Sequence, residues 1–287
     1  MTSLTASAAG SDKFRQMLNK VPEVTVFFWI IKVLCTTVGE TAADYLNDNL
    51  GFGLTNTSYL AAAVLVVVLV AQFRTRRYIP GIYWLAVVLI SVVGTLISDN
   101  LVENYGIALQ TTTIAFGIAL AVTFAAWYAS ERTLSIHTIY TTKREAFYWL
   151  AVLFTFALGT SAGDLVSEQA GLGYFVSILA FGGAIALVAL AHYRFRMGAV
   201  LAFWLAYILT RPLGASIGDW MSQPKSAGGL GLGATVTSYI FLGTILALVV
   251  YLTVTKVDET PTDFDDAEDP AALPAVGAEP ATDPARA

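Results

Sequence analysis

The chain has 287 residues, of which 56% are hydrophobic and only 13% are charged. This composition is typical of polytopic membrane proteins and excludes a soluble enzyme. The formal net charge of -5 arises at one end, because residues 258–287 hold nine acidic residues and a single basic one, Arg286. Without that stretch, 15 of the 16 basic and 12 of the 21 acidic residues remain, which gives a net charge of +3.

Eight stretches are long enough to cross a membrane, which takes a helix of about 20 mostly apolar residues. Residues 1–20 precede them and are polar, without the apolar core of a cleavable signal peptide, so the first membrane helix is expected to direct insertion. The stretches cover roughly residues 22–46, 55–73, 81–104, 107–129, 146–167, 173–193, 199–222 and 230–254. The sequence thus predicts an all-α polytopic membrane protein with eight transmembrane helices.

The predicted helices form two halves, residues 21–130 and 146–256, joined by a loop at 131–145. Residues 257–287 are acidic and rich in Pro and Ala, and they are predicted to be a disordered tail because they have almost nothing to bury. The single cysteine, Cys35, excludes an intramolecular disulfide, and its apolar surroundings indicate simple packing.

Basic residues mark one side of the predicted bundle. Of the 16 Lys and Arg residues, twelve fall on the side that holds both ends of the chain, namely Lys13, Arg15, Lys20, Arg74, Arg76, Arg77, Arg132, Lys143, Arg144, Arg194, Arg196 and Lys256. Only Lys225 falls in a loop on the other side. By the positive-inside rule, we expect a multi-pass protein of the bacterial inner membrane with cytoplasmic N- and C-termini.

The four odd-numbered segments share one pattern, in which an aromatic residue and a Trp are followed by a Gly ten residues after the Trp and an Asp five residues later. The tryptophans are Trp29, Trp84, Trp149 and Trp204; the glycines are Gly39, Gly94, Gly159 and Gly214; the aspartates are Asp44, Asp99, Asp164 and Asp219. The even segments repeat more weakly, with hydroxyls at Thr57, Thr112, Ser177 and Ser238. Small residues allow close helix packing. Because two crossings restore direction, we expect four parallel two-helix repeats around a pseudo-symmetry axis along the membrane normal.

The four repeats resemble those of a known membrane-protein family. Four tandem two-helix repeats, each with its tryptophan, are similar to a bacterial membrane-protein family known as a four-fold repeat of unknown function, and "KVPEV", "FWIIK" and "TTVGETAAD" resemble its first repeat. The resemblance covers residues 20 to about 254. It implies the family and the architecture but brings no established activity, so function has to be argued from the residues.

Polar residues of the odd segments lie on one helical face, because positions 7, 11 and 15 residues after the Trp are separated by only about 40° steps. Position 7 holds Thr36, Ser91, Phe156 and Arg211; position 11 holds Glu40, Thr95, Thr160 and Ala215; position 15 is always Asp. Lys32 lies nearby, three residues after Trp29. Four such faces turned toward one axis would be hidden from lipid, with the Asp residues about 22 Å beyond the Trp residues along the helix rise.

Each polar feature has a functional and a structural interpretation. The four Asp residues either form an outer vestibule for cations or protons, or cap the following helix and accept the hydroxyls of their hairpins. Glu40, Lys32 and Arg211 break the four-fold pattern, and a mid-membrane charge costs at least about 2.5–3.5 kcal/mol. They either form a buried ion pair, Glu40–Arg211 or Glu40–Lys32, that locks the first and last repeats together, or form a coupling site in which Lys32 or Arg211 competes with the ligand for Glu40.

The remaining features indicate packing. The Trp residues either line a pore or pack and anchor at the membrane interface, and packing is the preferred role. Pro212 is expected to kink the seventh helix.

His137 and His192 have no partner at metal-ligand spacing. We find no motif for a cofactor, for catalysis or for nucleic-acid binding, so we expect a protein that is not an enzyme and needs no cofactor.

The predicted function is a secondary transporter or permease for a small cation, either a hard metal ion or a proton-coupled cationic solute, through a central polar cavity. Carboxylate and hydroxyl ligands favour a hard ion such as Mg²⁺ or Mn²⁺, although the metal stays unknown. One alternative is a membrane scaffold or sensor that acts through its loops and acidic tail. Another is an intramembrane enzyme on a lipid or quinone, whose reactive groups should open sideways to the bilayer. The expected partners are the lipid bilayer and a small cation or proton, and a homo-oligomer remains open.

Overall fold

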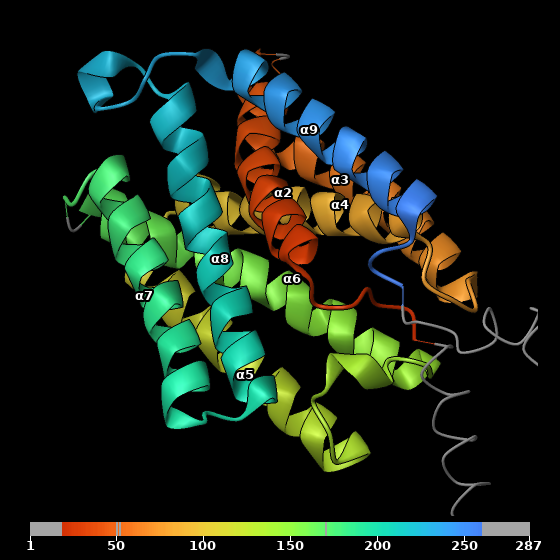
Figure 1. Cartoon of the computed structure of the whole chain (residues 1–287). Coiled ribbons are helices and arrows are strands. Elements are labelled where there is room, and N and C mark those ends of the chain that lie inside the picture. Colours follow the sequence, from red (N-terminus) through yellow and green to blue (C-terminus); the bar gives the residue numbers. More distant parts are fainter. Residues whose placement is uncertain (1–18, 50, 52, 170, 260–287) are drawn as a thin grey trace, which may run out of the picture.

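The computed structural model describes residues 19–49, 51, 53–169 and 171–259, and this part of the chain is helical, with no β-strand. Eight of its helices are long and apolar enough to cross a membrane, as the sequence predicts (Figure 1). They are α2 (Val26–Asp44), α3 (Gly53–Arg74), α4 (Pro80–Asp99), α5 (Leu109–Glu131), α6 (Thr142–Asp164), α7 (Tyr174–Phe195), α8 (Ala199–Ser222) and α9 (Gly233–Thr255). Most of the predicted N-terminal segment and acidic tail lies outside the described residues.

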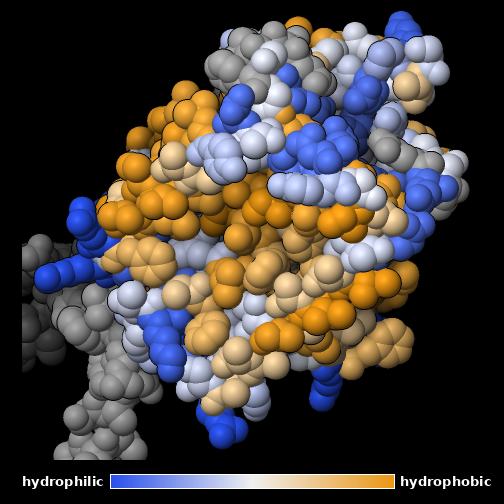
Figure 2. Space-filling view, turned by 180° about the vertical axis from the view of Figure 1, so that it is seen from behind, coloured by the Kyte–Doolittle hydropathy of each residue, from blue (hydrophilic) through white to orange (hydrophobic). Residues whose placement is uncertain are grey.

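The outer surface is apolar in the way that contact with lipid requires. Figure 2 shows hydrophobic residues over a broad area of one face, with hydrophilic residues gathered toward its edges. Large apolar side chains such as Val67, Leu187 and Leu246 point outward, each at least 65% exposed. An exposed apolar surface of this extent marks a membrane-embedded protein, so the chain is a multi-pass membrane protein.

The helices form an inner ring and an outer layer. In the first helix of each repeat (α2, α4, α6 and α8), 56–72% of the most apolar stretch is buried. In the second helix of each repeat (α3, α5, α7 and α9), only 6–28% is buried. The inner helices contact one another in the closed order α2, α4, α6, α8 and back to α2. The polar faces of α2, α4, α6 and α8 therefore turn toward a common interior, as the polar stripe predicts.

The outer helices connect neighbouring repeats. Helix α3 packs mainly on α4, α5 on α6 and α7 on α8, and each of these outer helices thus covers the inner helix of the following repeat. Helix α9 completes the circle by packing on α2, so that the last and first membrane helices lie side by side (Figure 1). The main partner of each outer helix therefore belongs to the next repeat, so the repeats interlock around the ring.

The repeated glycines let the inner helices approach closely. A Cβ atom on any of them would overlap the residue at position 7 of the next repeat. The contacts pair Gly39 with Ser91, Gly94 with Phe156, Gly159 with Arg211, and Gly214 with Thr36. The fourth contact returns to the first repeat, which shows that the pseudo-four-fold ring is closed. At each of these glycines the neighbouring inner helix lies too close for a side chain.

The aromatic pairs at the start of the inner helices form a second closed ring, which we call the aromatic girdle. Its members are Phe28, Trp29, Tyr83, Trp84, Tyr148, Trp149, Phe203 and Trp204. The first aromatic residue of each repeat contacts the Trp of the next, with ring centroids 5.6, 5.5, 6.2 and 5.6 Å apart around the circle. All four contacts are tilted, and aromatic pairs at such distances are stabilised beyond their buried area. The tryptophans therefore join neighbouring repeats.

Asn19–Thr25 before α2, the residues from Lys256 to Glu259 after α9 and the basic loops lie on one side of the bundle, here called the termini face. The remaining connections lie on the opposite side, called the loop face. At the loop face, three inner helices change to π-helix directly after the repeated Asp, in η1 (Tyr45–Asn49), η2 (Asn100–Asn104) and η4 (Leu165–Gln169). Two residues after each π-helix, a glycine has φ between +66° and +69°, namely Gly51, Gly106 and Gly171. Glycine adopts this conformation without the steric cost that other residues incur.

Two further features differ between repeats. Helix α8 runs without interruption through Pro212, so the expected kink does not break the helix, and the proline ring instead packs near Gly159 and Gly163. The last connection lacks a π-helix and contains the short 3₁₀-helix η5 (Lys225–Ala227), in keeping with its longer loop.

The termini face is held together by buried polar contacts. Lys20 forms a salt bridge of 2.7 Å with Glu145, whose other oxygen accepts from the Gln72 amide at 3.2 Å. After α9, the Asp258 carboxylate accepts from the Tyr78 hydroxyl at 2.6 Å. The segment before α2 and the residues after α9 are thus fixed to the ends of α3, α4 and α6.

Candidate functional site

The polar stripes of the inner helices meet in the interior, and Arg211 on α8 occupies its centre. The Arg211 side chain is fully buried. Its Nη2 donates to the Glu40 carboxylate at 2.8 Å and to the Thr160 hydroxyl at 2.6 Å, and it also contacts the Thr95 hydroxyl. Nη1 donates to the backbone carbonyl of Thr36 at 3.3 Å.

The partners of Arg211 follow the repeat. Glu40, Thr95 and Thr160 all occupy the position 11 residues after the Trp, each on a different inner helix. The equivalent residue of the fourth repeat is Ala215, whose small side chain leaves that position without a polar group. One cation from the fourth repeat is therefore bound by the equivalent positions of the other three, and the structural interpretation of an ion pair between the first and last repeats describes the geometry correctly.

Two hydroxyls strengthen the seam between α2 and α8. Thr36 donates to the Thr210 carbonyl at 3.3 Å, and Thr37 donates to the Gly214 carbonyl at 3.0 Å. Hydrogen bonds between membrane helices contribute about 0.6 kcal/mol each on average. The seam that carries Glu40 and Arg211 is thus bound by side chain to backbone contacts as well as by the ion pair.

Lys32 lies between the aromatic girdle and Arg211. It is 1% exposed, and its Nζ has no hydrogen-bond partner among the described residues. The Nζ atom instead lies 4.1 Å from the centre of the Phe156 ring and 4.2 Å from that of Tyr207. Cation–π attraction of this kind grows when the groups are desolvated. Lys32 is therefore held by aromatic faces and not by Glu40, so the predicted alternative of a Glu40–Lys32 pair is wrong.

The repeated aspartates form the layer beyond Glu40, toward the loop face. Asp44, Asp99 and Asp164 are each the last α-helical residue before a π-helix, whereas Asp219 lies within the last turn of α8 and is 8% exposed. Asp99 lies within electrostatic range of Glu40, Asp44 and Asp164. The carboxylates of three repeats thus share one region. None of them is the N-cap of α5, α7 or α9, since those caps are Ala108, Gly173 and Leu232.

The hydroxyls of the outer helices are buried near the loop face, but they do not act as one set. Ser238 donates to the Thr41 hydroxyl of α2 at 2.8 Å, which links the last and first repeats. Thr112 and Ser177 donate to carbonyls in the first turn of their own helices. The Thr57 hydroxyl is buried without a hydrogen-bond partner among the described residues.

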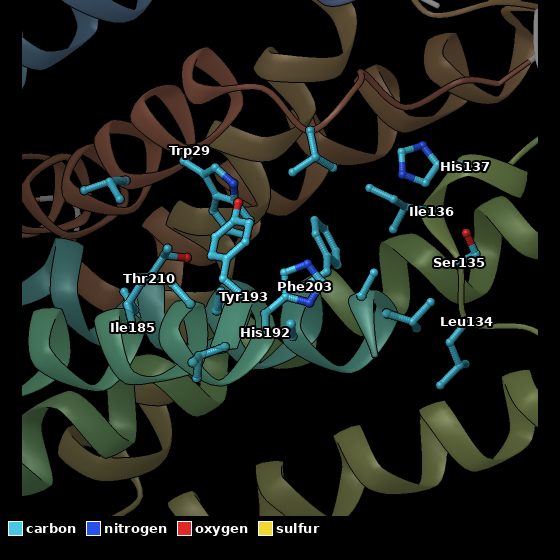
Figure 3. Close-up of a pocket in the computed structure, with 18 of the residues that line it drawn as sticks. Trp29, Leu134, Ser135, Ile136, His137, Ile185, His192, Tyr193, Phe203 and Thr210 are labelled. Carbon is cyan, nitrogen blue, oxygen red and sulfur yellow. The ribbon is translucent and has the colours of Figure 1, made fainter. Parts of the chain in front are cut away.

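A cavity of about 510 Å³ opens at the side of the α2–α8 seam, toward the termini face (Figure 3). Trp29, His137 and His192 are among the residues that line it. Neither histidine has a metal-ligand partner in the sequence, so no role was predicted for them. The structure places His137 in the short 3₁₀-helix η3 (Ile136–Thr138) between α5 and α6, and His192 in the last turn of α7. Within the described residues, no group of three or more His, Cys, Asp or Glu side chains is placed to hold a metal ion.

Comparison with known families agrees with the internal repeat. A family described as "Repeat of Unknown Function (DUF347)" matches four times, at residues 27–78, 82–133, 147–197 and 202–258. The chain belongs to this family. Searches of curated proteins and of solved structures gave no match. The matches begin within two residues of Trp29, Trp84, Trp149 and Trp204, so each family unit comprises one inner helix of the girdle and the outer helix that follows it.

The four family units share some residues and differ in others. The girdle, the glycines and the aspartates recur in all four units, whereas Lys32, Glu40 and Arg211 each occur in one. A four-fold scaffold therefore surrounds a site that is not four-fold symmetric.

Proposed function

We propose that this membrane protein is a secondary transporter or permease for a small cation, either a hard metal ion or a proton-coupled cationic solute. The observation that carries the proposal is the Arg211–Glu40 pair at 2.8 Å in the middle of the bundle, adjacent to the region that Asp44, Asp99 and Asp164 share. Burying an ion pair is costly compared with apolar packing, and intramembrane ionisable residues typically mark ion pathways.

In the proposed mechanism, Arg211 occupies the site when no ligand is bound. A cation that enters from the loop face first meets the aspartate layer, where grouped carboxylates attract positive charge. It then replaces Arg211 at Glu40, and the Thr95 and Thr160 hydroxyls that Arg211 releases become oxygen ligands for it. A hard ion prefers such ligands. A proton taken up by Glu40 would release Arg211 in the same way, which supports proton coupling.

The charge balance supports a cationic ligand. Four aspartates and Glu40 face two interior cations, Lys32 and Arg211, so the interior has a formal charge of -3 if all are ionised. Protons or cations relieve repulsion between carboxylates at short range. We place the loop face outside the cell, in accordance with the basic residues of the termini face.

The test uses a deletion strain profiled for metal sensitivity and metal content, complemented with wild type, Glu40→Gln or Asp164→Asn. Glu40→Gln keeps the shape of the side chain and removes its charge, so we expect complementation to fail. Glu131→Gln serves as the matched control, because Glu131 lies at the end of α5 and pairs with Arg144 at 2.9 Å, away from the interior. Full complementation by both Glu40→Gln and Asp164→Asn would reject the transport site.

The scaffold alternative makes a different prediction about the tail. A variant truncated after Glu259 keeps the buried hydrogen bond between Tyr78 and Asp258 and lacks residues 260–287, which hold the rest of the acidic tail. A transporter should retain its flux after this truncation, whereas a scaffold that acts through its tail should lose its phenotype. We propose transport and no enzymatic activity.

A further inference from the structure

We propose that the cavity beside the α2–α8 seam is a binding site for one acyl chain of an anionic phospholipid, with the headgroup at the termini face. The cavity, of about 510 Å³, lies between α2, α7, α8 and residues 134–137. This size is within the range of ligand sites, which combine mostly apolar walls with a few polar groups. The inference does not depend on the proposed transport function.

The outer helix at this seam carries smaller side chains than the outer helix at the neighbouring seam. At the neighbouring seam, α5 covers Trp204 with Phe124 and Trp127, whose ring centroids are 4.9 and 5.9 Å from it. Helix α7 is the equivalent outer helix at the α2–α8 seam, and each of its residues corresponds to the α5 residue whose number is lower by 65. At these two positions it carries Ala189 and His192, which both line the cavity.

The first Trp of the girdle is less covered than the other three. Trp84, Trp149 and Trp204 are 1%, 4% and 4% exposed, whereas Trp29 is partly exposed and forms part of the cavity wall. In Figure 3 the Trp29 side chain lies in the same opening as Tyr193 and Phe203. The small side chain of Ala189 beside the partly exposed Trp29 thus leaves room for an apolar ligand between α2, α7 and α8.

The opening and the length of the cavity fit an acyl chain. Tyr193 on α7 and Val200 on α8 lie at its edge and are 85% and 40% exposed on the apolar outer surface. The wall contributed by α8 runs from Ala199 to Leu213, a rise of about 21 Å, against about 30 Å for a whole hydrocarbon core. The cavity is therefore open to the bilayer and slightly deeper than one leaflet.

The polar end of the cavity favours a negatively charged headgroup. His192 Nδ1 lies 2.7 Å from the Met197 carbonyl, so this nitrogen donates and Nε2 remains for another partner. Arg194 and Arg196, both exposed, lie at the same end of α7. On the other side, His137 pairs with Glu23 at 3.4 Å. His192 in the cavity wall, together with Arg194 and Arg196 outside the wall at the same end of α7, thus places hydrogen-bonding and cationic groups at the level where phospholipid phosphates reside.

An occupant would contact the seam that carries the central ion pair. Thr210 lines the inner part of the cavity, and its carbonyl accepts the hydrogen bond from Thr36. The next residue is Arg211. A bound acyl chain would therefore stabilise the packing of the first repeat against the last.

The test is quenching of Trp29 fluorescence by phospholipids with brominated acyl chains, with the full chain reconstituted in bilayers. The Trp29 signal is the difference between wild type and Trp29→Phe. We expect brominated phosphatidylglycerol to quench it at a low mole fraction and to saturate, and brominated phosphatidylcholine to do so only at higher fractions. Arg194→Gln and Arg196→Gln should each weaken the preference for phosphatidylglycerol about fivefold, the effect of one surface cation on an anionic lipid.

A filling variant tests the cavity itself. Ala189→Phe restores the residue that α5 has at this position and should abolish the saturable quenching. Ala126→Phe is the matched control, because Ala126 is exposed on the outside of α5, and it should leave quenching unchanged. Trp29 quenching that rises in proportion to bulk lipid, or that persists in Ala189→Phe, would overturn the proposal. Equal saturation by both lipids would overturn its anionic part.

Discussion

Replacing Glu40 by Gln should destabilise the protein more than any other single neutralisation in the interior. The substitution preserves the shape of the side chain but leaves the Arg211 guanidinium, which is fully buried, without its anionic partner. The guanidinium keeps the hydroxyls of Thr95 and Thr160 and the Thr36 carbonyl, which solvate it only in part. The variant therefore isolates the contribution of one charge.

The magnitude follows from the burial of the pair. Removal of one partner of a buried ion pair costs about 3–5 kcal/mol, because the other charge stays uncompensated. The remaining hydroxyl contacts place Glu40→Gln near the lower end, about 3 kcal/mol. The double variant Glu40→Gln/Arg211→Gln removes both charges, and we expect it to be less destabilised than the sum of the two single variants by at least about 2 kcal/mol.

The assay is reversible unfolding of the purified protein in mixed micelles, followed by far-UV circular dichroism, for wild type, both single variants and the double variant. Glu131→Gln provides a control for the loss of a carboxylate whose pair lies near the surface, and surface pairs contribute only about 0–1 kcal/mol. Additive effects of the two single variants would refute the reasoning, because they would mean that Glu40 and Arg211 do not stabilise each other.

Three further outcomes are expected from the packing and from the termini face. Gly214→Ala should lower the free energy of unfolding by about 1–3 kcal/mol, because the new Cβ overlaps a hydroxyl of α2, whereas Gly243→Ala, which has open space around it, should raise it by up to about 1 kcal/mol through helix propensity. Unfolding measurements should also show that Trp84→Leu costs more than Trp29→Leu, because Trp84 is 1% exposed and Trp29 borders a cavity; the reverse order would contradict the girdle geometry. Burial raises the pKa of the Asp258 carboxyl above its ordinary value of 3.8, so the folded state favours its protonated form. Its contribution to stability should be complete below pH 3.8 and decline as the pH rises through the raised pKa. Asp258→Asn should remove this dependence in a pH series of unfolding measurements, and an identical pH profile for wild type and variant would rule out the buried carboxyl as its source.

The sequence by itself determined the class of protein, the number of membrane helices, the four-fold repeat and the face of each inner helix that turns inward. These features follow from local rules, since hydrophobic length fixes a span and a helix advances about 100° per residue. The repeat spacing also placed Glu40, Thr95 and Thr160 at one level, where the structure shows them around Arg211.

Only the tertiary structure decided which side chains pair and which repeats pack together. It joined Arg211 and not Lys32 to Glu40, because Lys32 lies between the Phe156 and Tyr207 rings of two other helices. It also placed α9 on α2, and it left Trp29 partly exposed in the wall of a cavity that Ala189 also lines. Such contacts join residues far apart in the chain, and their outcome depends on how the volumes of several helices fill one space, which no local pattern records.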